Sequence, residues 1–101
     1  MKDIHKAYTV FKSEFPELAG QIDTTSRALR VDGGPLDERT CALVKLAAAA
    51  ASGHQRAVET HLASAREAGV PEAEIKHALL LLITTCGFPT FMEAYSICKG
   101  V

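Results

Sequence analysis

The sequence lacks a block of basic residues, a long apolar run and a pair of closely spaced cysteines. Lysines and arginines total 11 against 12 aspartates and glutamates in 101 residues. A nucleic-acid-binding surface needs clustered positive charge, and no such cluster is present. The longest apolar runs also fall far short of the roughly 20 residues that a membrane-spanning helix needs. We therefore expect neither nucleic acid nor a membrane as a partner.

The cysteines form no recognisable framework. Cys41, Cys86 and Cys98 are widely separated and odd in number, which fits neither a disulfide scaffold nor a zinc-binding spacing. The N-terminal stretch MKDIHKAYTVF is charged and amphipathic, and it lacks the uninterrupted apolar region of a signal peptide. We expect a cytoplasmic protein with reduced thiols, no bound metal and no cofactor.

Hydrophobic residues make up 48% of the chain, which is enough for a packed core. Their spacing is helical throughout, and no stretch shows the alternation of a strand. The first expected helix runs up to Phe15, where the following Pro16 should end or kink it. The predicted fold class is all-α, a helical bundle of five or six helices.

Pro16 can open a second helix, with Leu18, Ile22 and Leu29 on its inward face. The breaker DGGP follows at 32–35. We interpret it as a loop between helices rather than a domain boundary, because neither side would bury enough surface alone. The whole chain, residues 1–101, is thus expected to form a single domain.

The region after this loop is more apolar. Asp37 is a suitable N-cap for a helix over 38–51, which ends at Ser52 and Gly53. This helix carries an alanine run at 47–51 and is expected to be buried on most sides. Another helix should follow over 54–68 and stop at Gly69.

Pro71 should occupy the first position of a further helix that reaches Cys86. Its inward stripe is Ile75, Ala78, Leu79, Leu82 and Cys86, and Leu80, Leu81 and Ile83 lie outside that stripe. A second apolar face on a helix of a small protein is typical of contact with another subunit, so we expect a homo-oligomer. A last helix over 90–99 should turn Phe91, Ala94, Tyr95 and Cys98 inward.

Two histidines follow the alanine run. His54 and His61 are seven residues apart, so on one helix they would point within about 20° of each other and lie about 10 Å apart along the axis. That separation is too large for one metal ion, because the helical zinc pairing uses i, i+4. His61 is then either a core histidine bonded to a carbonyl or a general acid or base in a pocket between helices. His54 is expected in the first helical turn, where the helix dipole disfavours a protonated ring, so a neutral imidazole there could accept a proton or a hydrogen bond.

The thiols and the remaining polar residues give weaker signals. Cys86 ends an apolar helix, where the helix dipole disfavours a thiolate, whereas Cys41 lies near a helix N-terminus with Arg39 close by, which favours one somewhat. Core packing is the favoured role for each cysteine. Lys45, with His77 and Glu93, is expected on a solvated face.

The stretches LDERTCALVKLAAAAASG and ETHLASAREAGVPEAEIKHALLLLITTCGFPTF resemble the carboxymuconolactone decarboxylase family over about residues 36–98. The pattern combines His61, Ala65 and Gly69 with an acidic helix start at Glu72 and a closing Cys-Gly-Phe-Pro. The resemblance implies an all-α, alkylhydroperoxidase-like subunit that assembles into trimers or hexamers.

The family has two chemical branches. The alkylhydroperoxidase-like branch carries a Cys-x-x-Cys pair and a glutamate, and the matching positions here are His54, Ala57 and Ala42. Dithiol peroxide reduction needs one thiolate to attack and a second to resolve, so the motif for that reaction is missing. His61 matches the histidine that both branches share, and the chain looks more similar to the decarboxylase branch.

The resemblance therefore implies a cofactor-free lyase that acts on a small organic acid or lactone. Its catalytic residues would be His61 as the acid or base and His54 in support, with Cys86 as a further candidate. Arg39 and Arg56 are the candidates for binding a substrate carboxylate. Two alternatives remain open: a thiol antioxidant that uses Cys41 or Cys86, and an oligomeric binding module without catalysis.

Overall fold

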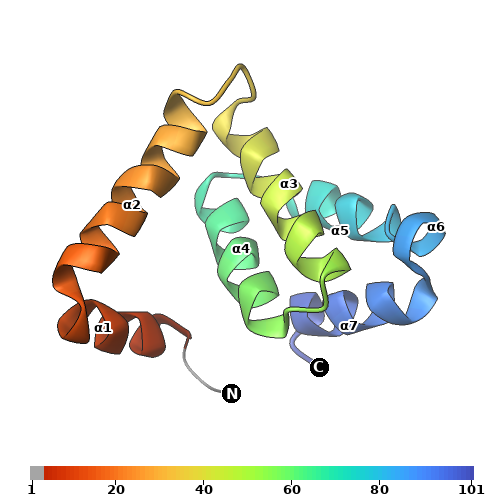
Figure 1. Ribbon diagram of the computed structural model, residues 1–101. Helices are drawn as coiled ribbons and strands as arrows, with labels where there is room; N and C mark the ends of the chain where they lie inside the picture. The colour runs from red at the N-terminus through yellow and green to blue at the C-terminus, as the bar shows by residue number, and fades with distance from the viewer. Residues whose placement is uncertain (1–3) are drawn as a thin grey trace. The chain divides into compact units, whose positions relative to one another are not determined.

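A computed structural model describes the backbone of residues 4–101 and the side chains of residues 6–101. It divides into two compact units, Met1–Leu36 and Asp37–Val101, which are described separately below (Figure 1). Helices and turns make up the described backbone, which contains no strand, so the predicted all-α class is confirmed. The expectation that both units form one domain stays a prediction. No helix in the described part of the chain has the length and apolarity to cross a membrane.

The first unit consists of helices α1 (Ile4–Glu14) and α2 (Pro16–Val31). As predicted, the helix breaks at Phe15, whose φ of −132° and ψ of 66° lie outside the helical region, and Pro16 opens α2. The two helices contact each other, and the Tyr8 hydroxyl donates a hydrogen bond to Asp23 Oδ1. The Tyr8 and Phe11 rings lie 6.2 Å apart, centroid to centroid.

The predicted inward face of α2 is wrong. Leu18, Ile22 and Leu29 are 48%, 46% and 67% exposed. Within the first unit, Ala19 is the sole fully buried residue among the described side chains. The reason is that periodicity shows which side chains share a face but not whether another element covers that face.

The second unit contains helices α3 (Glu38–Ala51), α4 (Gln55–Glu67), α5 (Glu72–Leu80), α6 (Ile83–Cys86) and α7 (Phe88–Lys99). The predicted ends of α3 and α4 are confirmed. Asp37 Oδ1 accepts a hydrogen bond of 2.8 Å from the Thr40 N–H and so caps α3. Gly53 and Gly69 follow the two helices with φ of +73° and +82°, the left-handed conformation in which glycine is favoured.

The apolar segment before Cys86 is not one helix, as the sequence predicts, but two. Its start also differs, since Pro71 precedes α5 as the N-cap. α5 ends at Leu80, the Leu82 N–H bonds the Leu79 carbonyl three residues back at 3.0 Å, and α6 adds a single turn. A turn of three residues brings side chains at i and i+3 onto one side. This tightening allows Leu79 and Leu82, both nearly fully buried, to enter the same core.

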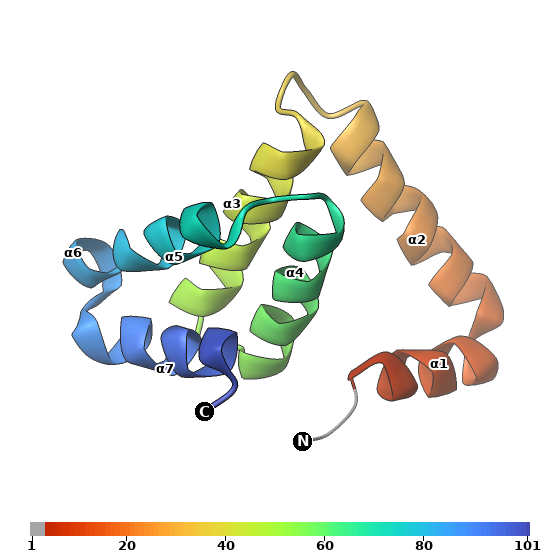
Figure 2. The ribbon, with the colours of Figure 1, turned by 180° about the vertical axis from the view of Figure 1, so that it is seen from behind.

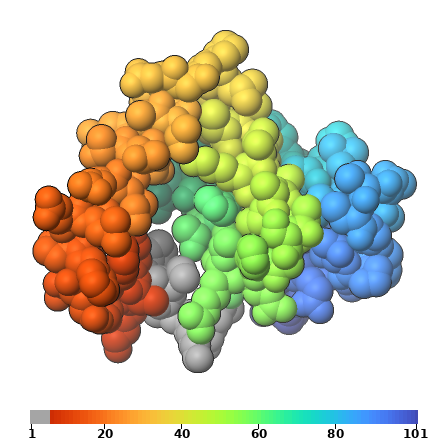
Figure 3. Space-filling model, viewed as in Figure 1, coloured from red at the N-terminus to blue at the C-terminus, as the bar shows by residue number. Residues whose placement is uncertain are grey.

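The hydrophobic core lies among α3, α4, α5 and α7 (Figure 2). α3 packs most extensively against α4, and the two helices lie side by side on the face shown in Figure 3. The inward stripes predicted for α5 and α7 are confirmed. The prediction that α3 is buried on most sides is wrong, because Leu46, Ala49 and Ala50 are buried whereas Val44 and Ala48 are exposed. The core residues are Ala42, Leu46, Ala49, Ala50, Val58, Leu62, Ala65, Val70, Ile75, Leu79, Leu82, Phe91, Ala94 and Cys98.

Candidate functional site

His61 lies in the middle of α4, at the edge of the face that α4 buries. It is partly buried and precedes the buried Leu62. Burial holds the pKa of the His61 imidazole below its usual value of 6.5, and the positive charge of Lys45 lowers that pKa further. His61 is therefore mostly uncharged at neutral pH, a state in which the ring can accept a proton.

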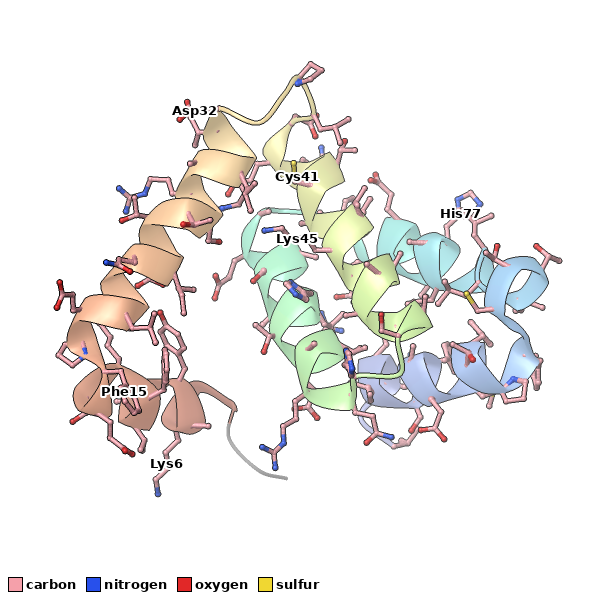
Figure 4. The ribbon with its side chains drawn as sticks, in the orientation of Figure 1. Lys6, Phe15, Asp32, Cys41, Lys45 and His77 are labelled. Atoms are coloured by element: carbon pink, nitrogen blue, oxygen red, sulfur yellow. The ribbon has the colours of Figure 1, made fainter. Side chains whose placement is uncertain are left out.

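Lys45 lies opposite His61 on α3. The two helices form an antiparallel pair joined by a short turn, and each residue is eight positions from Gly53, so both lie about 12 Å from the turn along their helix axes. Lys45 is partly buried, and Figure 4 shows it one turn after Cys41 on the same side of α3. Lys45 was predicted on a solvated face, and its side chain is less exposed than that, although it is not buried. The equal spacing of Lys45 and His61 from Gly53 was the signal that could have linked the two residues.

His54 occupies a different position from the one predicted. It precedes α4 with φ of −89° and ψ of 88°, and its side chain is exposed. The His54 N–H donates to the Ala49 carbonyl at 3.2 Å, and its own carbonyl accepts from the Val58 N–H at 2.9 Å. The second of these bonds is the first one of α4, so His54 is the N-cap of that helix, and its non-helical backbone turns its side chain away from the face on which His61 lies. The predicted alignment of His54 with His61 along one inward face is therefore wrong.

A cavity of about 260 Å³ lies where the turn between α3 and α4 meets α7. At its edge, Gln55 Nε2 donates a hydrogen bond of 2.9 Å to Glu93 Oε2. Neither His54 nor His61 lines this cavity, so it is not the pocket between helices in which the sequence analysis places a catalytic histidine. Its lining residues are Ala50, Gly53, Gln55, Val58, Pro89, Thr90, Glu93, Ala94 and Ile97.

The three cysteines lie in different parts of the second unit and form no disulfide. Cys41 is partly buried on α3, and Cys86 is partly buried on α6, against the core. Cys98 is buried on α7, with its Sγ 4.0 Å from Arg66 Nη2. Core packing, the role that the sequence favours, accounts for Cys98 and in part for Cys86.

The structure also shows where the possible metal-binding side chains lie, and where the two arginines lie that were expected to bind a substrate carboxylate. In the part of the chain that is described, no three His, Cys, Asp or Glu side chains gather closely enough to hold a metal ion. Arg39 forms an ion pair with Glu74 at 3.7 Å, whereas Arg56 is exposed on α4. Lys45 is thus the cation whose charge reaches His61.

Comparison with known families decides the relationship. Residues 16–99 match the carboxymuconolactone decarboxylase family. The chain belongs to this family. The match covers α2 as well as the region in which the sequence patterns were found, and it agrees with the all-α, alkylhydroperoxidase-like fold. Comparison with curated proteins gives no match.

Family membership supports a protein that is carboxymuconolactone decarboxylase-like or alkylhydroperoxidase-like. His54, which the resemblance to the family matches with the first cysteine of the dithiol pair, is exposed and precedes α4 as its N-cap. His61, in contrast, is the member of the predicted set that is partly buried and whose pKa responds to a charged neighbour, Lys45.

Proposed function

We propose that the protein is a cofactor-free lyase of the decarboxylase type, with His61 as the group that transfers the proton. The observation that carries this proposal is the environment of His61. Partial burial and the charge of Lys45 keep the imidazole uncharged near neutral pH. A ring in that state can act as a general base, and it can act as a general acid once it has taken up a proton.

The reaction requires few groups from the protein. In the decarboxylation of a carboxylated lactone, the bond to the carboxylate carbon breaks, and CO₂ leaves. The electron pair stays on the remaining carbon and is stabilised by the neighbouring unsaturated carbonyl system. Protonated His61 then delivers a proton to that carbon. Because CO₂ carries away no electrons and one proton is added, the step needs neither an oxidant nor a metal.

Turnover of carboxylated lactones tests the role of His61. We expect CO₂ release by the wild-type protein and a loss of kcat of about 10²- to 10⁴-fold in His61→Ala, the usual contribution of a general acid or base. His77→Ala is the matched control, because His77 is exposed on α5. Equal activity of His61→Ala and the wild type would remove His61 from the mechanism. His54→Ala, measured in parallel, tests the predicted supporting role of His54.

A thiol antioxidant is the second candidate. Cys41 supports it, since this partly buried thiol lies in the first turn of α3, one turn before Lys45. Peroxide would oxidise the thiolate to a sulfenic acid and be reduced to an alcohol or water, and an external thiol would have to restore it. If mass spectrometry detects no sulfenic acid at Cys41 or Cys86, this candidate is excluded.

We also propose that the protein forms a homo-oligomer through α5, α6 and α7. Leu80, Leu81, Phe88 and Met92 are 50%, 60%, 56% and 42% exposed, an unusual concentration of large apolar side chains. Light scattering after size-exclusion chromatography should show a smaller particle for Leu81→Glu than for the wild type. Ala73→Glu, at another exposed position on α5, should leave the mass unchanged. A monomeric wild type would refute the proposed assembly.

A further inference from the structure

Lys45 is a partly buried cation with no ion-pair partner among the described side chains. The ion pairs in that part of the chain join Arg39 to Glu74 and Arg66 to Glu72. A lysine can bury its stem along an apolar surface while its ammonium group stays accessible, so the charge of Lys45 is available to an anion. None of the described carboxylates pairs with Lys45 and competes for that charge.

The position of Lys45 gives such an anion a place next to the proton-transfer residue. Lys45 and His61 lie level with each other on neighbouring helices, each beside a residue of the core, Leu46 on α3 and Leu62 on α4. Helix axes in such pairs are about 8–10 Å apart. Two side chains of this length that leave neighbouring helices at the same level can both contact one small molecule.

We propose that Lys45 binds the anionic group of the substrate beside His61, and that the imidazole of His61 takes up a proton when this anion binds. The inference rests on the proposed function and adds two elements to it. It names Lys45 as the residue that selects substrates with a negative charge. It also places proton uptake by His61 after substrate binding rather than before it.

The electrostatics give the order of events. In the free protein, the Lys45 ammonium opposes protonation of His61. A carboxylate that binds Lys45 offsets that charge and itself favours a protonated ring nearby, so the pKa of His61 rises and solvent supplies a proton. When the carboxylate leaves as CO₂, His61 gives this proton to the substrate carbon. The site returns to its starting state, and one proton from solvent is consumed for each CO₂ released.

The other charged groups considered on the helices that pack against α4 either interact with other residues or are exposed to solvent. On α5, Glu72 binds Arg66 and lies within the field of Lys76 and Lys99, and Glu74 pairs with Arg39 of α3. On α7, Glu93 accepts a hydrogen bond from Gln55. Glu38 and His77 are exposed on α3 and α5. Lys45 is the charged side chain that shifts the pKa of His61, and no carboxylate among the described residues offsets its effect.

A pair of matched ligands tests the proposal. The probe is 5-oxotetrahydrofuran-2-carboxylate, a carboxylated lactone, and the uncharged comparison is γ-valerolactone. NMR titration of the His61 ring, assigned with His61→Ala, reports the pKa of the imidazole with and without each ligand. We expect the carboxylate to raise the pKa of His61 by about one unit in the wild type and the uncharged lactone to leave it unchanged.

Variants at Lys45 separate its charge from its packing. Lys45→Met keeps the length of the side chain and should weaken binding of the carboxylate about tenfold and abolish the ligand-induced rise in pKa. Lys45→Arg should retain both effects. Lys76→Met, which removes a partly buried lysine from α5, should behave like the wild type. Circular dichroism of each variant checks that the fold is intact.

The outcomes distinguish this inference from the proposed function. If the carboxylate fails to bind the wild type, or binds Lys45→Met equally well, Lys45 is not the anion-binding residue, even if CO₂ release still depends on His61. If Lys45 binds the carboxylate and raises the pKa of His61 but no carboxylated lactone is turned over, the inference about Lys45 holds and the lyase proposal fails.

Discussion

The two units of this protein use similar helical patterns but bury them to different degrees. In the unit Met1–Leu36, the long helix α2 leaves most of its apolar side chains exposed. In the unit Asp37–Val101, shorter helices converge on one continuous core. The number of helices that pack together explains this difference in burial. In the first unit α2 contacts α1, whereas in the second unit α3, α4, α5 and α7 all contact one another.

This contrast shows that apolar periodicity and burial are separate properties. Leu18, Ile22 and Leu29 recur at helical spacing as regularly as Ile75, Leu79 and Leu82, yet the first set is exposed and the second buried. The first set also lines a shallow hollow of about 400 Å³ along α2. Three predictions test how far the stability of the protein resides in the second unit.

Separating the units should produce the largest effect. We expect residues 37–101 to fold alone and to unfold cooperatively, because they contain the core. Residues 1–36 should lose most of their helical signal, because an isolated pair of helices of this size buries too little surface to remain folded. Circular dichroism of the two fragments at 222 nm measures this. A stable helical fragment 1–36 would contradict the proposed division of stability.

Matched isoleucine truncations should differ by several kcal/mol. Ile75 is fully buried and Ile22 is 46% exposed. We expect Ile75→Ala to lower the free energy of unfolding by about 2–5 kcal/mol, because it leaves a cavity in the core. Ile22→Ala should cost less than about 1 kcal/mol. Urea denaturation of both variants gives the comparison, and equal losses would show that α2 is covered in solution.

The smallest effect should be a pH dependence that arises in the second unit. The pKa of His61 is lowered in the folded chain, so below its usual value of 6.5 the unfolded chain takes up a proton that the folded chain resists. Stability should therefore fall as the pH drops below about 6.5, toward the lower pKa of the folded state. Denaturation between pH 5 and 7.5 should show a weaker decrease in His61→Gln, whereas His77→Gln should resemble the wild type.

Much of the local structure could be predicted from the sequence. The break at Phe15, the cap at Asp37 and the ends of helices at Gly53 and Gly69 depend on residues within one turn of the feature, so local signals sufficed. The break between α5 and α6 could not be predicted in this way, because the four leucines contain no breaker. It arises where the core draws Leu79 and Leu82 together.

The candidate site was only half predictable. His61 could be selected from its place on an apolar stripe and from the family pattern. Lys45 was overlooked, because its equal spacing with His61 from Gly53 becomes meaningful only if α3 and α4 pair as antiparallel neighbours around that turn. His54 was misplaced because helical spacing was extended one residue too far, to the N-cap of α4, where the backbone is not helical and the side chain is exposed.

By itself, the sequence determined that this chain is helical, where most of its helices begin and end, and to which family it belongs. Helix caps, helix breakers and apolar periodicity depend on residues that are close together in the sequence, so they can be recognised without the structure. Only the tertiary structure decided which apolar faces are buried and that Lys45 stands opposite His61. Burial and charge pairing depend on which helices lie side by side, and that choice is made by the whole set of packing contacts rather than by any one segment.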